Sequence, residues 1–199
     1  MSLSVFDNQP ILENNRVQLI PLQTEHATDL FSISEKDIWK YMPVKIRTLT
    51  DMQNWVDQAI SLRKKKTALP FVVLDKNTNQ LVGSTRLYDI HLYNRSCELG
   101  GTWYQKKHQR TYVNTDCKKL LLQFGFEKMN FVRIQIKTDE RNITSQNAIS
   151  RIGATKEGLI RNERILEDGY IRNAFLYSII QEEWPQVKQA LDHKINSYS

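Results

Sequence analysis

A helix-forming run that stands between two β-forming segments is the feature that most constrains how this chain can fold. The run, from about Asn114 to Met129, has apolar residues at i, i+3, i+4 and i+7, namely Cys117, Leu120, Leu121 and Phe124. This spacing gives one apolar helical face. The segments on either side, 97–103 and 132–138, have the composition and alternation of strands. The adjacent Gly100 and Gly101 predict a bulge in the first strand or the close approach of a ligand.

Further segments of both kinds occur before and after this unit. Strands are predicted at 17–22, 70–74, 81–87, 158–166 and 170–180, and helices at 25–33, 52–62, 144–152 and from about 182. Thr50 and Asp51 suit the cap of the second helix, and Gly153 suits the stop of the helix at 144–152. Asp168 and Gly169 predict a hairpin turn between the last two strands. The order predicts an α+β fold with one mixed, mostly antiparallel sheet flanked by helices.

Length and composition predict one domain. With 199 residues, 40% of them hydrophobic, the chain can bury one sizeable core. We expect a single domain over residues 1–199, with peripheral tails at 1–14 and 193–199. No apolar run has the length needed to cross a bilayer, and the N-terminus lacks the pattern of a signal peptide. A cytoplasmic location without a membrane partner is therefore expected.

Cysteine usage and charge restrict the partners. Cys97 and Cys117 form no CxxC pair and no His/Cys cluster with metal-ligand spacing, so we expect reduced thiols and no metal. The formal charge of +6 favours a phosphorylated cofactor, RNA or simply a solvated surface. Charge alone does not choose among them. The densest basic run, Arg63–Lys66, has no interleaved aromatic residues. We interpret it as a solvated helix end and expect no nucleic-acid partner.

Three segments resemble one known family. ELGGTW, QRTYVNTDCKKLLLQFGFE and the stretch from VRIQIKT to EEWPQV resemble the GCN5-related N-acetyltransferase (GNAT) superfamily, in its RimJ/RimL-like branch, and the resemblance covers nearly the whole chain. Its most specific part is a D-x-x-N-x-x-S segment followed by two glycines, here Asp139, Asn142, Ser145, Gly153 and Gly158. The resemblance implies a single GNAT-type domain, a splay between its fourth and fifth strands (97–103 and 132–138), and acetyl-CoA as cosubstrate.

The resemblance also implies a cofactor-binding loop before the long helix. Its residues here are Gln109, Arg110, Thr111, Tyr112, Val113, Asn114 and Thr115. A helix N-terminus suits a pyrophosphate because its N–H groups are unpaired. Tyr112 replaces a glycine of the family pattern. If that position needs a left-handed backbone, tyrosine costs about 1–2 kcal/mol; if the backbone is ordinary, the cost is only steric and the ring can point away.

Further roles follow from the same resemblance. A backbone N–H near Thr102 or Trp103 would polarise the thioester carbonyl. Asn142 would contact the cofactor, and the Ser145 hydroxyl would lie near its sulfur. The alternative for these two residues is helix capping.

Candidate groups for the amine acceptor come from other segments. Glu98 and Glu163 are the carboxylates that would serve as general base, and the alternative is that they form surface ion pairs. Trp39 and Tyr41 would wall the acceptor site, although core packing is the general role of large aromatic residues.

The function implied is an acetyl-CoA-dependent N-acetyltransferase that acts on a primary amine. The acceptor would be the N-terminal α-amine of a protein, as in enzymes that modify ribosomal proteins, or a small amine. Relatives often pair, so a homodimer is possible. The alternative is a non-catalytic GNAT-fold binding module whose loop is degenerate at Tyr112.

Overall fold

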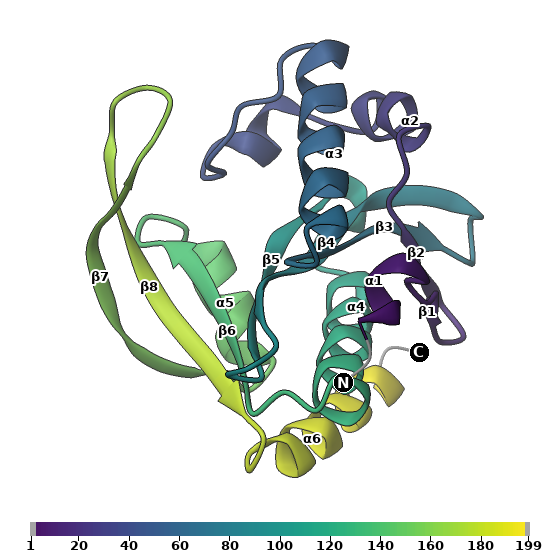
Figure 1. Cartoon of the computed structure of the whole chain (residues 1–199), viewed down its shortest axis with the longest axis vertical. Coiled ribbons are helices and arrows are strands. Elements are labelled where there is room, and N and C mark those ends of the chain that lie inside the picture. Colours follow the sequence, from purple (N-terminus) through teal and green to yellow (C-terminus); the bar gives the residue numbers. More distant parts are fainter. Residues whose placement is uncertain (1–2, 198–199) are drawn as a thin grey trace.

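One eight-stranded sheet organises the molecule. The computed structural model describes residues 3–197, and the strands lie in the order β1-β2-β3-β4-β5-β6-β8-β7 (Figure 1). Their bounds are Leu12–Glu13 (β1), Val17–Pro21 (β2), Leu69–Asp75 (β3), Gln80–His91 (β4), Ser96–Tyr104 (β5), Arg133–Asp139 (β6), Thr155–Ile165 (β7) and Ile171–Ile180 (β8). Only the β5–β6 pair is parallel among the described strand pairs. The predicted α+β fold with a mostly antiparallel sheet is confirmed.

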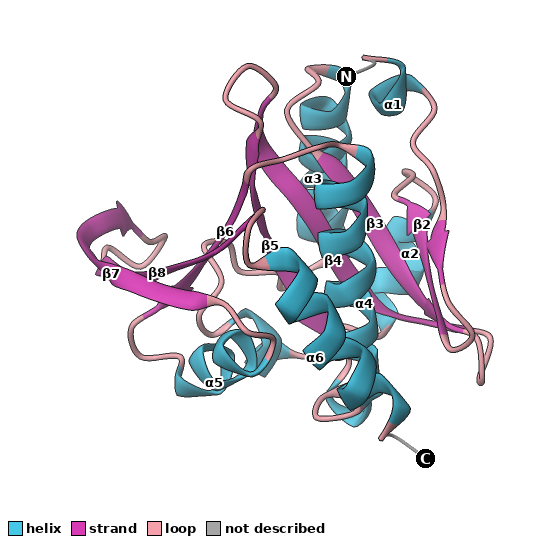
Figure 2. Ribbon diagram, turned by 90° about the horizontal axis from the view of Figure 1, so that it is seen from below, coloured by secondary structure: helices cyan, strands magenta, loops and turns pink. Residues whose placement is uncertain are grey.

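Helices cover both faces of this sheet (Figure 2). The α-helices are Ser4–Asp7 (α1), His26–Ser32 (α2), Leu49–Lys64 (α3), Tyr112–Gln123 (α4), Ile143–Arg151 (α5) and Trp184–Asn196 (α6), with short turns at Lys36–Trp39 (η1), Lys106–His108 (η2) and Phe124–Lys128 (η3). The main core lies between the sheet and α4 and α6. A second core lies on the α2 and α3 face, where Trp39, Trp55 and Trp103 pack together with ring centroids 5.4–6.5 Å apart.

The sheet opens between its two parallel strands. β5 and β6 pair only from Ser96 opposite Arg133 to Glu98 opposite Gln135. Beyond Glu98, β5 continues along β4 and β6 continues along β8. The two strands therefore separate toward their C-terminal ends, beside the long β7–β8 hairpin (Figure 1). This separation is the predicted splay between the strands at 97–103 and 132–138.

Two helix starts differ from the predictions. The predicted cap at Thr50 is wrong, because Thr48 caps α3: its Oγ1 accepts from Asp51 N at 3.1 Å, and Asp51 Oδ2 accepts from Thr48 N at 2.8 Å. This reciprocal pair satisfies two N–H groups at once. The helix predicted from Asn114 begins earlier, at Tyr112, and its end is the π-helical turn η3. A Cβ on Gly125 in that turn would lie 2.5 Å from Ile134 Cδ1, so the glycine allows η3 to pack closely against β6.

Both ends of the described chain contain helical segments. Phe6 of α1 is 3% exposed and belongs to the main core, and Gln9 Nε2 donates to the Pro70 carbonyl at 2.8 Å. α6 continues to Asn196. The predicted tails at 1–14 and 193–199 thus contain structured segments, and residues 1–2 and 198–199 lie outside the described part. Within residues 3–197, no helix combines the length and the hydropathy that a membrane crossing requires.

Candidate functional site

A bulge in β5 lies where the strand leaves β6. The single β4 residue Thr85 faces two residues of β5, Gly101 and Thr102. Gly101 has a φ of +56°, a left-handed conformation that glycine adopts without steric cost. The bulge predicted from the paired glycines is therefore confirmed. Because the extra residue of a bulge is left out of the ladder, backbone groups here are available to a ligand.

A buried lysine supports this bulge from α4. Lys118 is 5% exposed, and its Nζ donates to Thr102 Oγ1 at 2.8 Å. The same hydroxyl lies 2.8 Å from Thr85 Oγ1. Burial lowers the pKa of the Lys118 ammonium to about 7, because the charged form loses its hydration. These three side chains fix the bulge to α4.

The pH dependence of stability should reveal Lys118. Its pKa is about 7 in the folded protein and about 10.4 in an unfolded chain. Between these values the unfolded chain holds one more proton, so the free energy of unfolding rises with pH, by up to about 1.4 kcal/mol per pH unit. Below pH 7 both states are protonated and the dependence ends. Chemical denaturation of the wild type and of Lys118→Met should show the variant as more stable at pH 6–7.

The difference in the free energy of unfolding between Lys118→Met and the wild type tests whether Lys118 is buried as a neutral amine. It should shrink steadily from pH 7 to pH 9, because only the wild type contains the titrating amine. Burial raises the pKa values of the Cys97 and Cys117 thiols, and loss of the Lys118 charge removes one cause that lowers the pKa of Cys117. Both thiols therefore stay protonated from pH 7 to pH 9 in both folded proteins, and their contributions cancel. A difference that stays constant over this range would show that Lys118 is not buried in its neutral form.

The N-terminus of α4 ends the loop that follows the bulge. Thr111 is the N-cap: its Oγ1 accepts from Val113 N at 3.3 Å and donates to the His108 carbonyl at 2.8 Å. The exposed Arg110 before it has a φ of +62°. The first N–H groups of a helix have no acceptor within the helix and carry partial positive charge. This loop therefore has the backbone form of an anion-binding helix start.

The remaining residues of the predicted loop lie around this helix start. Gln109 Nε2 donates to the Tyr104 carbonyl at 3.1 Å, which ties the loop to the end of β5. Asn114 is half-buried and Thr115 is buried in the first turns of α4. Contact with a cofactor stays a prediction for each residue from Gln109 to Thr115.

Tyr112 turns away from this helix start. It has an ordinary helical backbone, as the first residue of α4. Its hydroxyl donates to Asp75 Oδ1 and accepts from Asn77 Nδ2, both at 2.9 Å, and Arg16 Cζ lies 4.8 Å from the ring centroid. The sequence leaves two alternatives for Tyr112, a left-handed backbone and an ordinary one, and the ordinary backbone is confirmed. The left-handed residue of the loop is Arg110.

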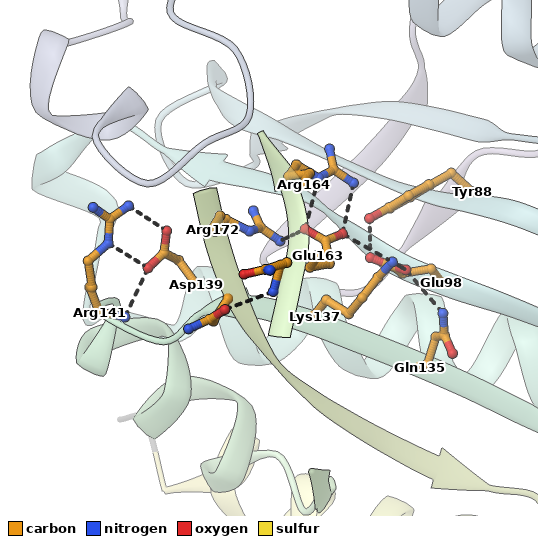
Figure 3. A network of polar contacts seen from close by, with 11 residues as sticks. Tyr88, Glu98, Gln135, Lys137, Asp139, Arg141, Glu163, Arg164 and Arg172 are labelled. Carbon is orange, nitrogen blue, oxygen red and sulfur yellow. Dashed lines mark hydrogen bonds and ion pairs between the residues drawn. The ribbon is translucent and has the colours of Figure 1, made fainter. Parts of the chain in front are cut away.

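Glu98 and Glu163 lie in one polar network (Figure 3). Lys137 joins them, with its Nζ 2.9 Å from Glu98 Oε2 and 3.6 Å from Glu163 Oε1. Glu98 is 2% exposed and also accepts hydrogen bonds from Tyr88 and Gln135. Because Cys97 and Leu99 face the main core and side chains alternate along a strand, Glu98 points to the α3 face. It is therefore no surface ion pair.

Glu163 is held by arginines. Its carboxylate lies 2.9 Å from Arg164 Nε and 3.0 Å from Arg172 Nη2. Burial alone would raise the pKa of Glu163, but the hydrogen bond from Arg164 and the charge of Arg172 lower it below its usual value. Both carboxylates are thus engaged by cations, and a role as general base stays a prediction for each.

Asn142 and Ser145 open α5, directly after the splayed end of β6. Asn142 Oδ1 accepts from Ser145 N at 3.0 Å, so the capping alternative is confirmed for Asn142. Asp139, which is 2% exposed, receives two hydrogen bonds from the Arg141 guanidinium and fixes the turn between strand and helix. The cofactor roles of Asn142 and Ser145 stay predictions.

The two predicted acceptor-wall residues differ in their surroundings. Trp39 is 1% exposed, and its Nε1 donates to Ser34 Oγ at 2.6 Å. It fills the second core and presents no wall, so core packing explains it. Tyr41 is half-buried, and Arg141 Cζ lies 5.7 Å from its ring centroid. Tyr41 therefore lies beside the turn between β6 and α5 and remains a candidate.

Lys118 escaped the sequence analysis although a signal for it exists. Thr115, Lys118 and Leu122 fall at i, i+3 and i+7 and are all buried, so α4 has a second buried stripe beside the apolar one. A lysine within such a stripe is uncommon, because lysine is almost never fully buried. The adjacent Lys119 is half-buried and forms an ion pair with Asp192, which is an ordinary role for a lysine on a helix.

Comparison with known proteins agrees with this geometry. The sequence profile of the acetyltransferase (GNAT) domain matches residues 16–155. The uncharacterized N-acetyltransferase YnaD of Bacillus subtilis (strain 168) is 25% identical over 154 residues, which cover 76% of this chain and 85% of YnaD. The crystal structure of a GCN5-related N-acetyltransferase from Brucella melitensis matches with a TM-score of 0.86 at 26% identity, over 94% of this chain and 85% of that one.

A further solved structure is similar in fold alone. It is the Salmonella typhimurium acetyl transferase that modifies the N-terminal serine of the 50S ribosomal subunit protein L7/L12. It matches with a TM-score of 0.77 at 17% identity, over 86% of this chain and 99% of that one.

Proposed function

Because the chain belongs to the acetyltransferase (GNAT) family, whose members are N-acetyltransferases, we propose that it transfers the acetyl group of acetyl-CoA directly to a primary amine. The acceptor is either the N-terminal α-amine of a protein or a small amine. The Salmonella protein of the same fold, which modifies an N-terminal serine, is an example of the first class. Both classes need the same chemistry: a neutral amine, a polarised carbonyl and a proton for the departing thiolate.

The opening between β5 and β6 is the observation that carries this proposal. The parallel pairing stops after Glu98, and the bulge with Gly101 follows within three residues. The N-terminus of α4 stands at the end of the next loop. An elongated ligand with an anionic middle and a thioester end is suited to this arrangement, because backbone donors are available at both places.

Each side chain then has a defined task. The loop from Gln109 to Thr115 holds the pyrophosphate, and a backbone N–H of Thr102 or Trp103 polarises the carbonyl. Asn142 orients the arm of the cosubstrate. The Ser145 hydroxyl donates a proton to the leaving thiolate.

The acceptor amine approaches from the face of the sheet that α2 and α3 cover, opposite the face covered by α4. There Tyr41 borders its path, and Glu98 or Glu163 accepts the ammonium proton. For either carboxylate to act as base, the ion pairs that engage it must loosen when the acceptor binds.

Calorimetric titration with acetyl-CoA, with CoA for comparison, tests the proposal. Binding in the micromolar range, about −8 kcal/mol, is expected, followed by thiol release when amines are added. Absence of heat, together with absence of thiol release across peptide and small-amine acceptors, would refute the proposed function.

Replacing Tyr112 should leave cosubstrate binding almost unchanged. The ring lies over the turn between β3 and β4 rather than at the helix start, so Tyr112→Gly should bind acetyl-CoA within about threefold of the wild type, a difference below roughly 0.7 kcal/mol. Tyr112→Phe, which keeps the ring and loses only the hydrogen bonds, is the matched control. A tenfold gain in affinity for the glycine variant would show that tyrosine obstructs the site.

A further inference from the structure

Arg86 is a charged side chain set against the bulge. On β4 it pairs with Gly100, and its guanidinium lies between two aromatic rings, with Cζ 5.0 Å from the Tyr88 centroid and 5.8 Å from that of Trp55. A Cβ on Gly101 would lie 2.6 Å from Arg86 Nε. Arg86 therefore touches the strand position where the thioester is expected, on the α3 face from which the acceptor approaches.

The guanidinium of Arg86 has no hydrogen-bond partner among the described residues. Its Nε is buried and unsatisfied. The charged or titratable groups that surround it are Tyr88, Asp89, Glu98 and Arg164. Of these, Glu98 is already paired with Lys137 and Arg164 with Glu163. The neighbouring cations Lys137 and Arg164 thus have carboxylate partners within 4 Å. Arg86 forms no such ion pair with Asp89, Glu98 or another described residue, and its closest described contacts of this kind are the rings of Tyr88 and Trp55.

Such an arrangement is costly in the absence of a ligand. Burial lowers the pKa of Arg86, but a guanidinium stays charged at neutral pH. Arg86 is half-buried and its Nε is fully buried, and a charge withdrawn from water in this way is normally paired, because desolvation is not compensated otherwise. Cation–π contacts with Tyr88 and Trp55 compensate only part of this cost. An anion that docks on the free N–H groups would supply the rest, because guanidinium and carboxylate match in geometry.

We propose that Arg86 binds the acceptor, and that the acceptor is a primary amine with a carboxylate close to its nitrogen. The inference rests on the proposed acetyl transfer and names its substrate class. An amine that attacks a carbonyl held at Thr102 or Trp103 lies near Arg86, so only a carboxylate within a few bonds of the nitrogen reaches the guanidinium. Free amino acids have this chemistry, and so do protein N-termini with Asp or Glu at the first or second position.

Matched acceptor pairs test the inference. Glycine, serine, aspartate and glutamate are each compared with the corresponding amide, and short peptides that begin with Asp or Glu are compared with those that begin with Asn or Gln. In one of the two groups, amino acids or peptides, we expect kcat/KM to be at least tenfold higher for the acceptor with the additional carboxylate than for its amide counterpart. The group that shows the preference identifies the source, amino acid or peptide.

Variants of Arg86 then locate the preference. Arg86→Gln should abolish it, mainly through a higher KM for the carboxylate-bearing acceptor, so that the two members of each pair are acetylated with similar kcat/KM. Arg86→Lys should retain part of it. Arg161→Gln, which removes an exposed cation from β7, should leave the preference intact. If Arg86→Gln lowers kcat/KM equally for the carboxylate-bearing and the neutral acceptor of each pair, Arg86 only supports the bulge, and the inference is overturned.

A binding measurement separates this inference from the proposed function. If neutral and carboxylate-bearing amines are acetylated at equal rates, the proposed acetyltransferase function is supported and the proposed role of Arg86 is refuted. If no amine is acetylated, titration of the CoA-loaded protein with N-acetylglycine, N-acetylglycinamide, and the N-acetylated Asp and Asn peptides still decides the matter. Tighter binding of a carboxylate-bearing member, lost in Arg86→Gln, supports the inference, and equal or absent binding refutes it.

Discussion

Replacing Gly83 by alanine is expected to lower the free energy of unfolding by about 3 kcal/mol. Gly83 lies in β4 opposite Tyr104 of β5. A Cβ at this position would lie 2.1 Å from the Trp103 carbonyl oxygen and 2.9 Å from Tyr104 Cα. These are backbone atoms of the adjacent central strand, so no side-chain rotation relieves the overlap. The two strands must separate, which breaks ladder hydrogen bonds next to the bulge.

Thermal and chemical denaturation measure this effect. For a chain of this length each kcal/mol corresponds to about 2–4 °C, so the melting temperature should fall by roughly 6–12 °C. Gly158→Ala in β7 is the matched control, because a Cβ there has no neighbour within 4 Å and the backbone has no left-handed φ. It should change stability by no more than about 0.5 kcal/mol. A Gly83→Ala protein as stable as the wild type would mean that β4 and β5 are not packed as closely as described.

The contrast between these glycines shows what the sequence could reveal about the fold. Gly153 was predicted as a helix stop and has a φ of +90°, and Gly169 was predicted in a hairpin turn and has a φ of +79°. Both constraints are local, since they depend on the backbone of the residue itself. The constraint on Gly83 comes from a strand about twenty residues away, and nothing in its own neighbourhood along the chain indicates it.

The candidate site shows the same limit. Glu98 and Glu163 were identified as separate candidates for one role, but β8 lies between β6 and β7 in the sheet, and Lys137 on β6 contacts both carboxylates. The contact of both carboxylates with the Lys137 ammonium depends on strand order, which no local pattern encodes. The sequence makes Trp39 a candidate for the acceptor wall because it is a large aromatic residue. Its burial follows from the packing of Trp55 and Trp103 around it.

Removing Arg16 should cost about 3–5 kcal/mol of stability. Arg16 Nε and Nη2 donate to Asp116 Oδ2 and Oδ1, each at 2.8 Å, and the Asp116 side chain is fully buried in α4. Arg16→Met would leave this carboxylate in the core without its cation. The loss should be far larger than for Arg47→Met, because the pair of Arg47 with Glu167 is exposed on both sides and such pairs contribute little. Urea denaturation of both variants measures the contrast.

The double variant Arg16→Met, Asp116→Leu distinguishes a stabilising ion pair from a buried charge that merely needs its partner. A pair removed as a whole leaves no uncompensated charge, so the double variant should recover most of the stability lost in Arg16→Met. Acetyl-CoA binding by the double variant should stay close to that of the wild type, because the helix start at Thr111 keeps its own hydrogen bonds. If the double variant is instead as unstable as Arg16→Met, the pair itself stabilises the junction of β2 with α4 through its paired hydrogen bonds.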